Sequence, residues 1–194
     1  MTIEYHVPDK QTARAAQGVC RPSPKSWSGT ASGSMTDGDG RVQTWTTSLT
    51  MPLDPDFDGS DGFAWYHKTD GSSEGTATWQ LSGTDSSGCS WQGSGQILVT
   101  AEVSLTEYEG VPPAYELRLH KAFFGGEGKA THTCPGQQPS EDTWDPLLFA
   151  DGEMCDPGPL AYNGETKLSG EAHYTAGDSQ DSQIDCSWSL NAGY

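Results

Sequence analysis

Residues 89–105 read CSWQGSGQILVTAEVSL, and this stretch decides the fold class. Its apolar members share one parity along the chain: Cys89, Trp91, Ile97, Val99, Val103 and Leu105. Polar side chains take the alternate positions: Ser90, Gln92, Gln96, Thr100, Glu102 and Ser104. Successive side chains of a β-strand point to opposite faces, so the alternation predicts a strand with one buried face. Gly93 and Gly95 predict a bend within it.

The same alternation recurs along most of the chain. In residues 41–51 the apolar Trp45, Leu49 and Met51 alternate with Thr44, Thr46, Ser48 and Thr50. Further apolar rows are Ala77, Trp79 and Leu81; Tyr115, Leu117, Leu119 and Phe123; Leu168, Ala172 and Tyr174; and Ile184, Cys186, Trp188 and Leu190. Turn-forming sequences separate these rows, at residues 37–40, 85–88, 125–128 and 163–164. We therefore predict an all-β fold, an antiparallel β-sandwich or a partly closed barrel of about 9 to 10 strands.

The domain organisation follows from where the alternation begins and where it lapses. We assign residues 27–194 to a single β domain and residues 1–26 to an N-terminal arm with a strand at 3–7 and a short helix at 9–17. Residues 135–162, rich in proline, glycine and acidic residues, predict a long loop. The strand of the arm is expected to add to the protein's own sheet or to that of a neighbour.

Five cysteines, with no C-x-x-C pair among them, favour disulfides over a zinc site. We expect Cys89 to pair with Cys134 and Cys155 with Cys186, which leaves Cys20 free. Neighbouring hairpins and the need to anchor the long loop favour this pairing, although the cysteine count alone also allows others. Disulfides imply an oxidising compartment, so we expect a secreted or cell-surface protein.

The charge of the chain excludes one class of partner. Ten Lys and Arg against 27 Asp and Glu give a net charge of −17, which repels nucleic acid. No run approaches the roughly 18 apolar residues that a membrane span needs, so we expect no membrane insertion. The first 20 residues lack the apolar region of a signal peptide.

One acidic stretch suggests a metal site. Asp54, Asp56 and Asp58, followed by Gly59, match the opening of a calcium-binding loop, and Asp61 adds a fourth carboxylate. The closing glutamate of an EF-hand is replaced by Trp65, so an EF-hand is rejected. We expect an exposed turn with at most weak affinity for calcium as the only cofactor.

Aromatic residues outside the alternating rows are the candidates for ligand binding. Trp27, Trp65 and Trp144 lie at strand ends or in loops, where an indole could stack on a sugar ring or cap the core. His120 and His132 flank a turn, but the expected hairpin places them on opposite faces and makes a metal pair improbable. Residues 71–75 match G-x-S-x-G, yet a strand follows instead of the helix that a nucleophile elbow needs. No catalytic residue is assigned.

These observations favour a non-enzymatic extracellular or cell-envelope module that binds or assembles. Two alternatives stay open. One is a carbohydrate-active protein, either a sugar-binding module or a glycoside hydrolase, and the other is a structural subunit of a surface fibre. The expected partners are a glycan or a surface protein, and self-assembly through an edge strand is a further expectation.

Overall fold

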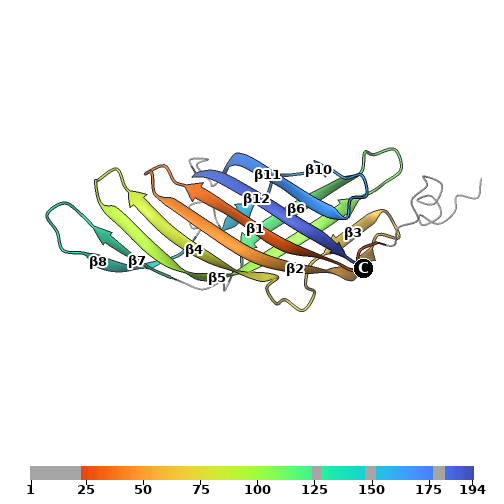
Figure 1. Ribbon diagram of the computed structural model, residues 1–194, viewed down its shortest axis with the longest axis horizontal. Coiled ribbons are helices and arrows are strands. Elements are labelled where there is room, and N and C mark those ends of the chain that lie inside the picture. The colour runs from red at the N-terminus through yellow and green to blue at the C-terminus, as the bar shows by residue number, and fades with distance from the viewer. Residues whose placement is uncertain (1–22, 124–127, 147–151, 177–181) are drawn as a thin grey trace, which may run out of the picture.

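The computed structural model describes residues 23–123, 128–146, 152–176 and 182–194, and within them every regular element is a strand (Figure 1). The strands are β1 (Ser26–Thr36), β2 (Val42–Asp58), β3 (Phe63–Tyr66), β4 (Gly75–Thr84), β5 (Ser90–Thr106), β6 (Ala114–Lys121), β7 (Gly128–Thr133), β8 (Ser140–Trp144), β9 (Glu153–Cys155), β10 (Leu160–Ala161), β11 (Lys167–Ala176) and β12 (Ser182–Gly193). The predicted all-β, antiparallel fold is confirmed, although with 12 strands where about 9 to 10 were expected from the alternating rows.

Two long strands organise the sheet because each is paired with two shorter strands along one edge. β2 pairs with β1 on one side, and on the other it pairs with β4 over Val42–Leu49 and with β3 near its end. β5 pairs with β4 and then β3 along one edge, and with β7 and then β6 along the other. A front layer of β11, β12, β1, β2 and β4 therefore continues through β5 into a second layer built around β6 (Figure 1).

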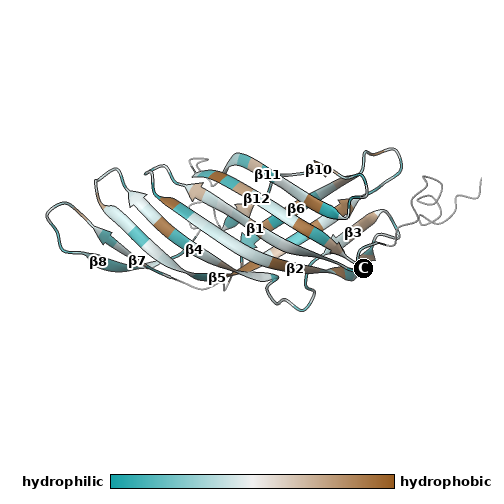
Figure 2. Ribbon diagram, viewed as in Figure 1, coloured by the Kyte–Doolittle hydropathy of each residue, from teal (hydrophilic) through white to brown (hydrophobic). Residues whose placement is uncertain are grey.

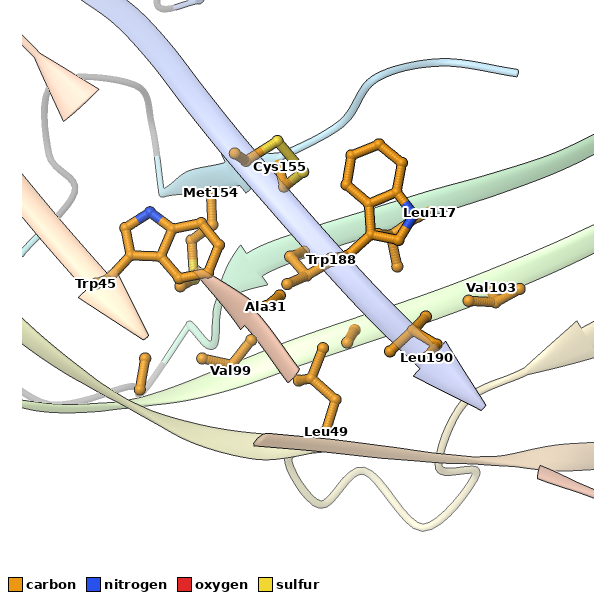
Figure 3. Close-up of a cluster of buried hydrophobic side chains, with 14 of the residues drawn as sticks. Ala31, Trp45, Leu49, Val99, Val103, Leu117, Met154, Cys155, Trp188 and Leu190 are labelled. Atoms are coloured by element: carbon orange, nitrogen blue, oxygen red, sulfur yellow. A yellow bond between two sulfur atoms is a disulfide. The ribbon is translucent and has the colours of Figure 1, made fainter. Parts of the chain in front are cut away.

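The core lies between these two layers. Figure 3 shows Ala31, Trp188 and Leu190 of the front layer facing Leu117, Met154 and Cys155 of the second. All of these side chains are at most 4% exposed. β9 belongs to the second layer through its pairing with β6, and Cys155 of β9 is bonded to Cys186 of β12. The layers are thus cross-linked as in a sandwich, while β10 and β11 remain the two ends of the sheet path and the barrel is not closed.

Both expected disulfides are confirmed. Cys89 is bonded to Cys134, beside the pairing of Ser90 in β5 with Thr133 in β7, and Cys155 is bonded to Cys186. Cys20 and the rest of the expected N-terminal strand and helix lie outside the described residues.

Buried tryptophans lie directly opposite glycines of neighbouring strands. The pairs are Gly33 with Trp45, Gly95 with Trp79 and Gly170 with Trp188. A Cβ atom added at Gly33 would lie 2.7 Å from the Trp45 ring, and one at Gly170 would lie 2.6 Å from the Trp188 ring. Each indole therefore occupies the space that the glycine leaves empty, which explains why strand interiors tolerate these glycines.

The structure corrects the expected hairpin between residues 115–123 and 130–134. β6 and β7 do not pair with each other; they lie one after the other along the same edge of β5. β6 ends at Lys121, and Phe123, expected to point inward, is 91% exposed. The 17-residue length of β5 is the physical reason, because it offers room for two partners in sequence where a hairpin needs only one.

The expected long loop at 135–162 is also different in the structure, since β8, β9 and β10 all lie within it. These short strands form because they pair with neighbouring strands, and their own sequences show no clear alternation. β8 pairs with β7, whereas β9 and β10 pair with β6. Segments of two to five residues carry too little periodicity to be recognised from the sequence.

Candidate functional site

The outer surface of the front layer is the most uniform chemical feature of the molecule. We call it the hydroxyl face and define it by outward Ser, Thr and Gln side chains of β1, β2, β4, β5 and β12. Its members are Ser28, Thr30, Ser32, Ser34, Thr44, Thr46, Ser48, Thr50, Thr76, Thr78, Gln80, Ser82, Gln92, Ser94, Gln96, Ser187 and Ser189. None of them is buried. In Figure 2 these strands are mostly pale, the colour of middling hydropathy.

The strand register aligns these side chains into rows that cross the sheet. One row runs Ser187, Ser32, Thr46, Thr78, Gln96, and the next runs Ser189, Thr30, Ser48, Thr76. Neighbouring strands lie about 4.8 Å apart and alternate residues of one strand about 6.7 Å apart. Within the first row the Ser32 and Ser187 hydroxyls are hydrogen-bonded at 3.2 Å. The face is therefore a two-dimensional grid of hydroxyl and amide groups.

Shallow hollows lie next to one another on this grid. One of about 580 Å³ is lined by residues of β12, β1, β2 and β4, with Thr30, Thr46 and Thr78 among them. Another of about 590 Å³ is lined by residues of β2, β4 and β5, including Gln80 and Gln96. The two share Thr46 and Thr78, so together they form a continuous depression across the strands.

The outward side chains of β1, β4 and the central part of β2 include no Asp, Glu, Lys or Arg, although the net charge of the chain is −17. Leu98 of β5, opposite Thr76, and Asp185 of β12, opposite Ser34, interrupt the grid toward its edges, and a border hollow of about 800 Å³ is lined by Glu171 and Asp185. Charged side chains appear at its borders, in pairs. On β11 and β12, His173 Nδ1 lies 2.5 Å from an oxygen of Asp185, and on β7 and β8, Lys129 Nζ lies 2.5 Å from an oxygen of Glu141. The centre of the face is thus neutral and polar.

Such a surface has a defined binding chemistry. A Ser or Thr hydroxyl both donates and accepts hydrogen bonds, and a Gln amide offers donors and an acceptor side by side. Ligands with many neutral hydroxyl groups match this pattern, because they too donate and accept at every position. Charged ligands gain no ion pair from the centre of the face, and anionic ones are repelled by the acidic protein as a whole.

Two of the three expected ligand-binding tryptophans belong to the core. Trp27 is 0% exposed and Trp144 is 9% exposed, with Trp144 Nε1 donating to Gln43 Oε1 at 3.1 Å. Neither ring can stack on a ligand in this structure, and this corrects the expectation for both. Large indoles remove much apolar area from water, which favours burial wherever a strand end meets the core.

Trp65 is half-buried and lies on the outer surface of the second layer. Its Nε1 donates to Glu102 Oε2 at 3.1 Å, and its ring packs against His67 with centroids 3.9 Å apart and against Phe57 at 5.7 Å. Glu102 also pairs with Arg118, whose guanidinium lies close to Glu116 and Asp156 as well. The aromatic face is thus occupied by neighbouring side chains and the carboxylates surround one cation.

The expected calcium ligands do not converge. Asp54, 5% exposed, accepts a hydrogen bond from the Asp56 backbone N–H and lies 3.0 Å from His67 Nε2. Asp58 and Asp61 each accept from a backbone N–H two residues further on. In the described part of the chain no three His, Cys, Asp or Glu side chains are grouped as a metal ion would require. These carboxylates accept hydrogen bonds within local turns, and that of Asp54 also contacts the His67 ring.

The remaining candidates have structural surroundings. His132 stacks on Trp91 with centroids 4.7 Å apart and pairs with Asp142, whereas His120 lies opposite Thr100 and Glu153, so the two histidines have different neighbours. In the 71–75 segment, Ser72 Oγ donates to Asp70, and the chain continues into β4. The Ser72 hydroxyl and the Asp70 carboxylate belong to one exposed turn, and a strand follows it in place of the helix of a nucleophile elbow.

The hydroxyl face was not singled out from the sequence, although its signal is present there. Thr44, Thr46, Ser48 and Thr50 are recognisable as the outward parity of one strand. What the sequence does not give is the strand order, which sets similar rows from β1, β4, β5 and β12 beside them. Runs of outward Ser, Thr or Gln at alternate positions are the sequence signal of these strands.

No family model, curated protein or solved structure matches this chain. Within the described residues, no helix has the length and apolar character of a membrane span.

Proposed function

We propose that this protein is a non-catalytic binding module that recognises a neutral, hydroxyl-rich polymer, a polysaccharide in chemical class, through its hydroxyl face. The observation that carries the proposal is the complete absence of charge from the centre of that face in a chain of net charge −17. Surfaces that only maintain solubility carry charges of both signs, so a neutral polar area of this extent needs another reason.

The shape of the surface favours binding over hydrolysis. A glycoside hydrolase needs two carboxyl groups about 5 to 10 Å apart across a cleft. The hollows of the hydroxyl face are open, and the two at its centre are lined by no carboxylate. A grid several strands wide instead suits a long chain or a polymer surface that makes many weak contacts at once.

The compartment follows in two steps. Two disulfides indicate an oxidising environment. The finer proposal is a secreted or cell-surface location, where neutral polysaccharides are accessible to a protein. We expect the binding to be the same in calcium and in chelator, because none of the side chains that define the face is a carboxylate.

The proposal is tested by co-sedimentation with insoluble neutral polysaccharides and by a glycan array, each in calcium and in chelator. Thr46→Ala combined with Thr78→Ala removes the two hydroxyls shared by both hollows and is expected to lower affinity at least tenfold. The matched control is Ser104→Ala combined with Thr106→Ala on β5, outside the face, which is expected to bind as the parent does.

Thermal melts of the two double variants are expected to show similar small losses, of about 1 kcal/mol, because each replaces two strand hydroxyl residues outside the core by alanine, which has lower β-propensity. Binding that persists in the Thr46→Ala, Thr78→Ala variant contradicts the site. Absence of binding to every neutral polysaccharide, with intact folding, contradicts the function.

A further inference from the structure

β11 presents a long edge to which no strand of the described chain is paired. It pairs with β12 over all of Lys167–Ala176, and its other side has no neighbour among the described strands (Figure 1). The other end of the sheet path is β10, of two residues. Natural proteins protect long edges with proline, bulges or central lysines, whereas β11 has an unbroken register and its only lysine at one end.

The inner face of β11 is also incompletely covered. Gly170, Ala172 and Tyr174 point inward but are half-buried, whereas the inward residues of the neighbouring β12 are buried from Ile184 to Leu190. The core therefore ends in a partly exposed row at this edge. A further strand on β11 would cover that row and satisfy the free backbone groups together.

We infer that the occupant is a second copy of the same chain, paired β11 to β11 in antiparallel fashion about a two-fold axis at Ala172. This register places Glu171 opposite His173 of the second copy, and Gly170 opposite its Tyr174, each twice by symmetry. Leu168 then meets Ala176, and Ser169 meets Thr175. In this one alignment a carboxylate lies opposite an imidazole, a hydroxyl opposite a hydroxyl, and an apolar side chain opposite an apolar one.

Neighbouring registers are poorer. An axis at Glu171 would set the Glu171 carboxylates of the two copies against each other, and like charges directly opposite destabilise a sheet. An axis at Gly170 would place Lys167 opposite His173 and leave Glu171 opposite Ser169. An axis at Ser169 would leave residues 172–176 without a partner in the opposing strand. The alignment at Ala172 pairs residues 168–176 and avoids these contacts.

The pairing does not depend on the proposed glycan binding, but it has a consequence for it. Antiparallel pairing about such an axis continues the sheet and keeps the outer surfaces of both copies on the same side. The two hydroxyl faces would then form one extended surface, and a polymer that contacts both gains avidity.

The experiment is cysteine cross-linking with every variant in a Cys20→Ser background, so that Cys20 contributes no cross-link. Residues directly opposite in an antiparallel pair have Cα atoms about 4.5 to 5.5 Å apart, within the range of a disulfide. Ala172→Cys is therefore expected to give a covalent dimer on mild oxidation. Ser169→Cys and Thr175→Cys are each expected to stay monomeric alone and to form a heterodimer when mixed.

Sedimentation of the unmodified protein at about 0.15 M salt, where the net charge is screened beyond roughly 8 Å, provides the independent readout. A concentration-dependent dimer is expected, and Glu171→Pro, which removes a backbone N–H that points away from β12 toward the edge, is expected to abolish it. A monomer throughout the micromolar range, or cross-linking of Ser169→Cys to itself instead of Ala172→Cys, overturns the inference. Circular dichroism of the Glu171→Pro variant checks that it remains folded.

Discussion

The indole of Trp79 lies against three glycines, Gly93 and Gly95 of the neighbouring β5 and Gly128 of β7. A Cβ atom at Gly95 would lie 3.0 Å from Trp79 Nε1, and one at Gly128 would overlap the ring. We predict that Trp79→Ala destabilises by about 3 to 5 kcal/mol, because it leaves a cavity in a tightly packed site. Gly128→Ala is predicted to cost about 1 to 3 kcal/mol by overpacking the same site.

The two effects are coupled, which supplies the check. Trp79→Phe relieves the overlap that Gly128→Ala creates. Urea melts of Trp79→Phe, of Gly128→Ala and of the double variant should therefore show a coupling energy above about 0.5 kcal/mol. Strict additivity would mean that Gly128 and the Trp79 ring do not compete for space.

Asp85 is a second residue whose surroundings give a prediction. The Ser87 hydroxyl and the Trp91 indole both donate to its carboxylate, and they hold the pKa of Asp85 well below its ordinary value of 3.8. Because the pKa is lower in the folded than in the unfolded protein, the carboxylate stabilises the fold at neutral pH, and this contribution is lost as the pH falls below the ordinary value.

We therefore predict that Asp85→Asn is less stable than the parent at pH 7 and that the difference narrows below about pH 4. Chemical denaturation at a series of pH values measures it. A difference that stays constant across that range would show that the ionised carboxylate is not the stabilising form.

At the scale of elements, Glu74 fills the gap between β3 and β4 along the edge of β5. β3 ends at Tyr66 and β4 begins at Gly75, and between their pairings with β5 the backbone N–H of Ala101 has no strand partner on that side. Glu74 is 7% exposed, and its carboxylate accepts from Ala101 N at 3.0 Å and from Lys68 N at 2.7 Å.

Glu74→Ala is predicted to destabilise by about 1 to 3 kcal/mol, because it leaves a buried N–H without an acceptor. Glu74→Gln should fall between, since an amide offers one oxygen where the carboxylate offers two. Exposed Glu109→Ala is the matched control and should lie within about 0.5 kcal/mol of the parent in the same melts. Equal values for the two alanine variants would contradict the proposed role of Glu74.

At the scale of the whole molecule, the bond between Cys155 and Cys186 joins the two layers, whereas the bond between Cys89 and Cys134 joins neighbouring strand ends. Replacing both Cys155 and Cys186 by Ser is predicted to cost about 2 to 4 kcal/mol. Hydrogen exchange should show faster opening of β9, which pairs with the rest of the sheet only through β6 among the described strands. Unchanged protection of β9 would show that packing of Met154 alone holds it.

The sequence by itself determined the strand class and the inward parity of the core tryptophans Trp45, Trp79 and Trp188, because both rest on local alternation. It favoured the two disulfides but also allowed other pairings, and the structure confirms the expected one. Only the tertiary structure decided what depends on strand order. It placed β6 and β7 along one edge of β5, buried Trp27 and Trp144, and turned the aspartates of residues 54–61 toward local partners. It also set the hydroxyl rows of distant strands side by side. Alternation specifies which face of a strand is buried, but it carries no information about which strand lies next to it. The hydroxyl face depends on that strand order, because its rows come from several adjacent strands.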